Sequence, residues 1–104
     1  MIISKQIQKP QLVLIVDDQE INRDILQLIL EENYELLFAE NGKEALDIIH
    51  KRGDELSIIL LDLMMPVVDG FEVLETVKKD EKYKSIPIIV LTADKSAELK
   101  ALQM

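Results

Sequence analysis

Apolar residues along the chain follow two kinds of pattern: short unbroken runs, and longer stretches in which they recur every three or four positions. Four runs are almost wholly apolar and rich in branched side chains, which is typical of strands buried on both faces of a parallel sheet. These runs cover residues 12–16, 34–39, 56–61 and 86–91. Glu35 favours an edge position for the second strand, and Pro87 is tolerable because it opens the fourth.

The stretch after the first run predicts an amphipathic helix. From Glu20 onward, apolar residues recur at helical spacing and polar residues occupy the opposite face. The apolar stripe consists of Ile21, Ile25, Leu28 and Ile29, and the polar face of Arg23, Asp24, Gln27 and Glu31. We therefore expect the stripe to be the packed side of this helix.

Capping residues mark the next two helices. Asn41, with Glu44 three residues later, resembles a capping box, and the helix that it opens closes near Gly53. Asp69 can cap a third helix that runs from Gly70 to about residue 80. A fourth helix is expected to begin near residue 95, and the sequence ends at residue 104 before much of that helix is complete.

Strand and helix thus alternate four times with short connections, which indicates a parallel sheet with helices on both faces. We predict an α/β, flavodoxin-like, doubly wound parallel sheet with strand order 2-1-3-4. Residues 1–10 are expected to be an N-terminal leader or linker, and residues 11–104 one domain, as the length of 104 residues suggests.

Charge and composition exclude several classes of function. Twelve basic and twenty acidic side chains give a net charge of −8, which would repel a phosphate backbone or an anionic membrane. We expect no binding of nucleic acid by this segment and no membrane association. The absence of cysteine agrees with a reducing cytoplasm, and the chain is expected to be cytoplasmic.

Polar side chains stand at the carboxyl ends of three predicted strands. Asp17 and Asp18 follow the first strand, Asp62 the third and Thr92 the fourth. If the first and third strands are neighbours, the three carboxylates meet in one pocket, where each pair repels by roughly 3 kcal/mol at about 5 Å. A hard divalent cation such as Mg²⁺ would offset that repulsion. Asp62 could then attack phosphorus, and the Thr92 hydroxyl could hydrogen-bond a phosphoryl oxygen.

Each of these residues also has a purely structural interpretation. An Asp-Asp pair after a strand is, on its own, more often a turn or a helix cap. Met64 and Met65 are expected to serve loop and core packing rather than to be ligands through sulfur, and His50 suits the negative end of its helix dipole without any catalytic role. The functional interpretation depends on all three carboxylates sharing one edge of the sheet.

Three segments carry a resemblance to a known family. LVLIVDD, LLDLMMPVVDG and IPIIVLTA closely resemble the response-regulator receiver domain of two-component signalling, and the resemblance extends from about residue 12 to residue 104. It implies that Asp62 is a phosphoacceptor, served by a histidine kinase or a histidine phosphotransfer domain. It further implies that Asp18 and Asp62 ligate Mg²⁺, that Asp17 assists through water, and that the Met64 backbone carbonyl is another ligand.

Other residues receive roles from the same resemblance. Thr92 corresponds to the switch hydroxyl, Ala93 keeps access to it open, and Pro66 and Gly70 match the turn after the acceptor. Met64 and Asp94 occupy positions that tune loss of the phosphoryl group, and an apolar side chain at the first implies slow autodephosphorylation. The expected activity is at most Mg²⁺-dependent autophosphorylation from a phosphodonor and this slow reversal.

The sequence departs from the family at its C-terminus. The fifth strand with its lysine, and the fifth helix, have no counterpart before residue 104. We therefore expect the domain to be C-terminally incomplete and, in the full-length protein, to be linked to an output or kinase domain. An uncovered apolar surface would also favour a homodimer or a domain swap.

Three other functions are to be weighed against a phosphoacceptor. The chain could be an interaction or dimerisation module with the receiver fold and impaired or no phosphotransfer, because the lysine segment is absent. A phosphatase of the haloacid-dehalogenase type needs an acid two residues after its nucleophile, where this chain has Met64. A flavin site needs a phosphate loop after the first strand, where Asp17 and Asp18 would repel the phosphate.

Overall fold

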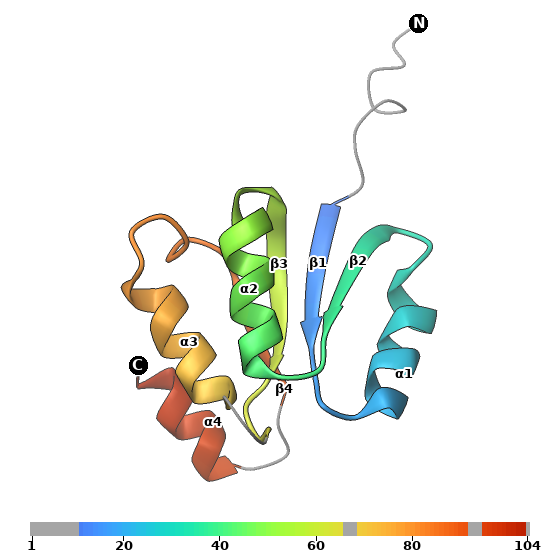
Figure 1. Ribbon diagram of the computed structural model, residues 1–104. Coiled ribbons are helices and arrows are strands. Elements are labelled where there is room, and N and C mark those ends of the chain that lie inside the picture. Colours follow the sequence, from blue (N-terminus) through green and yellow to red (C-terminus); the bar gives the residue numbers. More distant parts are fainter. Residues whose placement is uncertain (1–10, 66–68, 92–94, 104) are drawn as a thin grey trace, which may run out of the picture.

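A computed structural model describes residues 11–65, 69–91 and 95–103. Four strands form one sheet in which every neighbouring pair is parallel (Figure 1). They are β1 (Gln11–Val16), β2 (Tyr34–Ala39), β3 (Leu56–Asp62) and β4 (Ile88–Leu91), in the order β2-β1-β3-β4. The predicted α/β sheet and its strand order are confirmed, and Glu35 lies on an edge strand of the described sheet, as expected.

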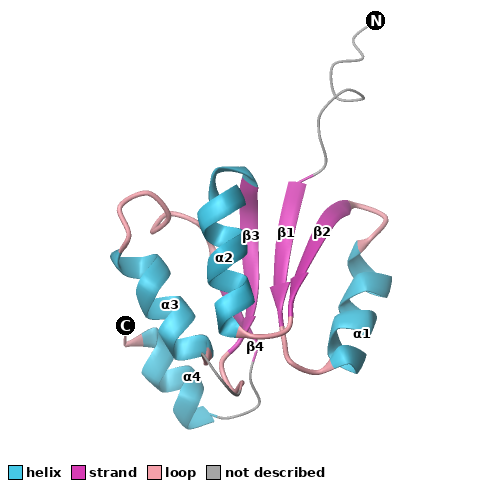
Figure 2. Cartoon of the chain, in the orientation of Figure 1, coloured by secondary structure: helices cyan, strands magenta, loops and turns pink. Residues whose placement is uncertain are grey.

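Helices alternate with the strands along the chain (Figure 2). They are α1 (Glu20–Leu30), α2 (Gly42–Arg52), α3 (Gly70–Lys79) and α4 (Lys95–Leu102), with a short 3₁₀ turn at Gly53–Glu55. No helix of the described residues is long and apolar enough to span a membrane.

Both predicted caps are confirmed. The Asn41 side chain accepts a hydrogen bond from the Glu44 amide at 2.8 Å, and the Glu44 carboxylate accepts one from the Glu40 amide at 3.0 Å. The first bond satisfies a helix amide that an isolated helix end would leave unpaired, and the second ties the residue before the cap, Glu40, to the first turn of the helix. Asp69 likewise accepts from the Glu72 amide at 3.0 Å and fixes the start of α3.

Side chains alternate between the two faces of the sheet and build a core on each. On β1, Leu12, Leu14 and Val16 pack with α2 and α3, whereas Val13 and Ile15 pack with α1. Both sets are almost fully buried. The unbroken apolar run of β1 is therefore explained by burial on both faces, which is what the sequence pattern predicted.

The prediction for the face of α1 was wrong. Leu26 and Leu30 pack against the sheet, whereas the predicted stripe is exposed, with Ile25 at 49% and Leu28 at 76%. Helical spacing identifies residues that share a face, but α1 carries apolar residues on two faces, so the spacing alone could not decide which of them meets the sheet.

The fourth strand is shorter than the run that predicted it. It begins at Ile88, and the two residues before it belong to the preceding connection. Pro87 lacks an N–H and contributes only its carbonyl, which accepts from the Ile59 amide at 3.0 Å. Regular pairing of β4 with β3 therefore starts at Ile88, one residue after the proline.

Candidate functional site

The register of the sheet brings the acidic residues together. Val16 of β1 is paired with Leu61 of β3, so the residues that follow them, Asp17 and Asp62, emerge at the same level. One oxygen from each of Asp17, Asp18 and Asp62 lies within 4.8 Å of the other two. The predicted convergence of the three carboxylates therefore exists at the carboxyl edge of the described sheet.

Asp17 is the buried member of the cluster, with only 4% of its surface exposed. Its carboxylate accepts hydrogen bonds from the Gln19 amide at 2.9 Å and from the Asn22 side-chain amide at 3.2 Å. Its own amide donates to the Ala39 carbonyl at 3.1 Å. These contacts hold the Asp17 carboxylate in one orientation from the beginning of α1.

Burial and neighbouring charges both affect the pKa of the Asp62 carboxyl group. Burial raises the pKa of Asp62, the Met64 amide opposes this by donating to its carboxylate at 3.0 Å, and the charges of Asp17 and Asp18 raise the pKa further. Desolvation and like charge therefore both disfavour the ionised form of Asp62. A hard cation with oxygen ligands would relieve both effects, so the donor set fits Mg²⁺.

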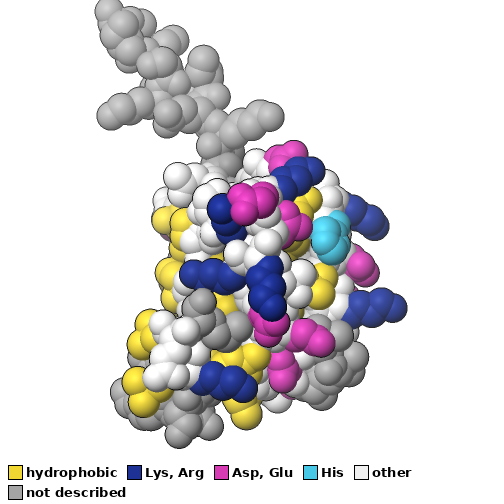
Figure 3. Space-filling model, turned by 90° about the vertical axis from the view of Figure 1, so that its left-hand side faces the viewer, with side chains coloured by type: hydrophobic (Ala, Val, Ile, Leu, Met, Phe, Trp, Pro, Cys, Tyr) yellow, Lys and Arg dark blue, Asp and Glu magenta, His cyan; other side chains and the backbone are white. Residues whose placement is uncertain are grey.

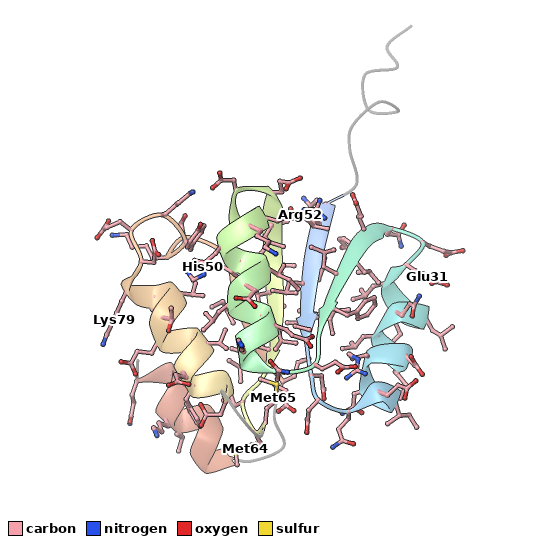
Figure 4. The ribbon with its side chains drawn as sticks, in the orientation of Figure 1. Glu31, His50, Arg52, Met64, Met65 and Lys79 are labelled. Carbon is pink, nitrogen blue, oxygen red and sulfur yellow. The ribbon has the colours of Figure 1, made fainter. Side chains whose placement is uncertain are left out.

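The two adjacent methionines in the loop after β3 differ in exposure. Met64 exposes 57% of its surface, and Met65 is buried in the core at 7%. Figure 4 shows both beyond the end of β3. The expectation that Met65 serves packing is confirmed, while Met64 presents its side chain to the surface and its backbone amide to Asp62.

Gly70 allows α3 to begin directly against the end of β3. Its amide donates to the Leu63 carbonyl at 3.2 Å. A Cβ at this position would overlap the Asp62 carbonyl oxygen and the Leu63 Cα, both of which are backbone atoms that cannot rotate away. The glycine of the predicted turn is therefore required by close approach of α3 to the end of β3.

His50 belongs to a different part of the molecule. It lies in the last turn of α2, on the side of the molecule away from Met64 (Figure 4). Its ring meets that of Tyr83 edge-on with centroids 6.1 Å apart, and its carbonyl accepts from the Tyr83 hydroxyl at 3.4 Å. These contacts are structural.

Four residues of the predicted turn and switch lie outside the described residues: Pro66, Thr92, Ala93 and Asp94. Residues 1–10, expected to be a leader or linker, also lie outside them. The roles given to these segments stay predictions.

Sequence reasoning missed the residues that hold the acidic loop in place. Arg23 was expected on the polar outer face of its helix, yet only 14% of its side chain is exposed and it donates to the Asp17 carbonyl at 2.7 Å. Asn22 was given no role, although it contacts the Asp17 carboxylate. Their place in the first turn of the helix after the acidic pair was the available signal, because that turn faces the loop preceding it.

Comparison with known proteins agrees with this geometry. Residues 13–104 match the family of response regulator receiver domains. The chain is 38% identical over 85 residues to the polar-differentiation response regulator DivK of Brucella anthropi, a match covering 81% of this chain and 68% of that protein.

Two solved structures extend the comparison. The phosphorylated cyanobacterial phytochrome response regulator RcpA is 26% identical, with a TM-score of 0.83, over 91% of this chain and 75% of that one. The Mn²⁺-bound form of response regulator Rcp1 is 27% identical, with a TM-score of 0.80, over 90% of this chain and 75% of that one.

A parallel 2-1-3-4 sheet with three converging carboxylates at its carboxyl edge defines a receiver domain. The chain belongs to the response regulator receiver domain family of two-component signalling. It spans about two thirds of the length of the curated relatives that it matches, 68% for the Brucella anthropi regulator and 65% for that of Brucella ovis.

Proposed function

We propose that this chain is a phosphoacceptor module and that Asp62 receives the phosphoryl group from a histidine kinase or a histidine phosphotransfer domain. The observation that carries the proposal is the convergence of Asp17, Asp18 and Asp62 at the end of β3. A carboxylate oxygen of Asp62 attacks phosphorus, the phosphorus–nitrogen bond of the donor phosphohistidine breaks, and its electron pair stays on the leaving imidazole.

The same residues are proposed to hold Mg²⁺. Asp18, Asp62 and the Met64 backbone carbonyl would be direct ligands, and Asp17 would act through water. A bound divalent cation supplies charge neutralisation for an incoming phosphoryl group. Support comes from the oxygen-only donor set and from a relative whose structure is described as Mn²⁺-bound.

The chain's own groups orient the acceptor in this proposal. The Met64 amide donates to one Asp62 oxygen, which leaves the other oxygen available for attack. Gly70 keeps α3 against the Asp62 backbone. Thr92 would bind a phosphoryl oxygen as the switch hydroxyl. Autodephosphorylation would be slow because the exposed Met64 side chain cannot orient a water, although Asp94 stands at the second tuning position.

The pure interaction module receives no support from the site, because the carboxylates that phosphotransfer needs are present and converge. The specific partners are part of the proposal too. They are a histidine kinase or phosphotransfer domain, a linked output or kinase domain, and a second copy of the chain. A cytoplasmic setting belongs to the proposal as well.

Intact mass after incubation with acetyl phosphate tests the central step. We expect the chain to gain one phosphoryl group with Mg²⁺ present, and to gain none when Mg²⁺ is chelated or in the Asp62→Asn variant. A gain that persists in Asp62→Asn would assign the chemistry to another residue. No gain in the parent chain, despite measurable Mg²⁺ binding, would refute phosphotransfer while leaving the metal site intact.

A further inference from the structure

Arg23 connects the two loops that flank the acidic cluster. Its Nη1 donates to the Asp17 carbonyl oxygen at 2.7 Å, and its Nη2 lies 3.3 Å from the Glu40 Oε1. Asp17 opens the loop between β1 and α1, and Glu40 lies in the loop between β2 and α2. We call these two contacts the Arg23 bridge.

The two ends of the Arg23 bridge differ in exposure. The guanidinium side chain is 14% exposed, whereas the Glu40 side chain is 65% exposed. The shorter contact of Arg23 is therefore the buried one, because it is made to the backbone of Asp17, which is itself 4% exposed. A hydrogen bond from a charged donor to a buried carbonyl is among the stronger contacts in a protein.

Arg23 contacts the Asp17 backbone and the Glu40 carboxylate, and within the described residues it makes no hydrogen bond to a carboxylate oxygen of the cluster. Asp17 presents its carboxylate to Gln19 and Asn22 instead. The guanidinium thus acts on the loop through its backbone and does not occupy the carboxylate oxygens that a cation would need. Because its partner is the carbonyl of the peptide that joins Asp17 to Asp18, it also fixes the direction in which the chain enters Asp18.

We propose that Arg23 is a positioning residue of the acidic site: it holds the Asp17–Asp18 peptide so that the Asp18 and Asp62 carboxylates can share one divalent cation. This inference rests on the metal role in the proposed function. Residues that orient metal ligands without touching the metal typically change affinity by about 10–100-fold when they are removed. Glu40 serves to orient the outer nitrogen of the guanidinium.

Calorimetric titration with MgCl₂ of the whole chain tests the proposal. Arg23→Ala is expected to weaken Mg²⁺ binding by about tenfold. Lys51→Ala is the matched control, because it removes one positive charge from an exposed position on α2, and it should leave the affinity within about twofold of the parent. Arg23→Lys keeps the charge but not the two-pronged geometry, so its affinity should lie between those of the parent and Arg23→Ala.

Phosphorylation kinetics separate positioning from loss of fold. If Arg23 acts through metal binding, saturating Mg²⁺ should restore the rate of mass gain in Arg23→Ala, while circular dichroism shows the variant folded. A rate that stays low at saturation, an affinity equal to that of the parent, or full rescue by Arg23→Lys would each overturn the proposal.

Amide hydrogen exchange, measured without metal, tests the Arg23 bridge separately from metal binding. If the parent chain binds no Mg²⁺, the metal role is refuted, and this measurement still tests whether the bridge orders the loop. Loss of the Arg23 bridge should speed exchange of the Asp17 and Gln19 amides several-fold, relative to Leu14 within β1, and Lys51→Ala should not. Unchanged exchange in Arg23→Ala would show that the bridge does not order this loop.

Discussion

Asp62 carries a charge that the fold does not favour, because burial and the charges of Asp17 and Asp18 raise its pKa. A carboxyl group with a raised pKa in the folded state binds its proton more tightly there than in the unfolded chain. Its ionisation therefore lowers stability as pH rises from the unfolded value of about 3.9 through the raised folded value. Above that window the full cost is present, and below it there is none.

Replacing Asp62 with asparagine should remove this cost. Without Mg²⁺ at neutral pH, we expect Asp62→Asn to raise the Tm, because the variant carries no charge at this position. The gain should shrink as pH falls through the raised pKa. Thermal unfolding followed by circular dichroism across this pH range measures it, with Asp47→Asn on the exposed side of α2 as control. An equal gain in both variants would contradict the assignment to the cluster.

Two glycines provide a matched pair of substitutions. A Cβ on Gly70 would overlap backbone atoms of Asp62 and Leu63, whereas a Cβ on Gly53 would overlap the ring of Tyr83. Both alanine variants should lose about 1–3 kcal/mol in urea unfolding because a close-packed contact is forced apart. Only Gly70→Ala should also weaken Mg²⁺ binding and phosphorylation. Equal effects on the site would mean that stability alone governs it.

Among the elements, α1 shows where sequence patterns stop being informative. Its helical period was predicted correctly, yet its packed residues were not, because apolar side chains occupy both its sheet-facing and its outer surface. The strands and caps were predictable because burial on two faces and short-range capping leave local signatures. The Arg23 bridge joins loops that are distant in sequence, and it follows from packing rather than from any local pattern.

Paired substitutions on α1 test its observed orientation. Leu26 is partly buried against the cluster formed by Val13, Ile15 and Leu60, so Leu26→Ala should cost about 1–2 kcal/mol, less than a fully buried leucine would. Leu28 is 76% exposed, so Leu28→Ala should stay within about 0.5 kcal/mol of the parent. Urea unfolding of the two variants decides the matter. The reverse order of effects would restore the orientation that the sequence predicted.

At the scale of the molecule, apolar surface remains uncovered on the α1 side of the sheet. Ile21, Ile25, Leu28 and Ile29 of α1 expose 49–76% of their surfaces. Ile89 of β4 exposes 49%, and it points to the same side as Leu91, which packs with the α1 cluster. In the described sheet β4 pairs only with β3. Viewed from the side of α3 and α4, hydrophobic side chains also reach the surface between charged ones (Figure 3).

Two forces then act on self-association in opposite directions. Burial of the apolar surface favours a second copy, at about 25 cal/mol per Å², and the net charge of −8 on each copy opposes it. Salt screens the repulsion and leaves the apolar contribution in place. The chain should therefore pass from its monomer mass of 11.9 kDa toward twice that mass as NaCl is raised from about 0.05 to about 0.5 M.

Light scattering coupled to size exclusion, at fixed protein concentration, measures this transition. Ile25→Glu should keep the chain monomeric at high salt, because it places a charge within the exposed apolar stripe of α1. Gln27→Glu adds the same charge at an exposed polar position of the same helix and should leave the dimer intact. Monomer at every salt concentration would exclude the dimer. Equal disruption by both variants would mean that charge, rather than the apolar stripe, controls assembly.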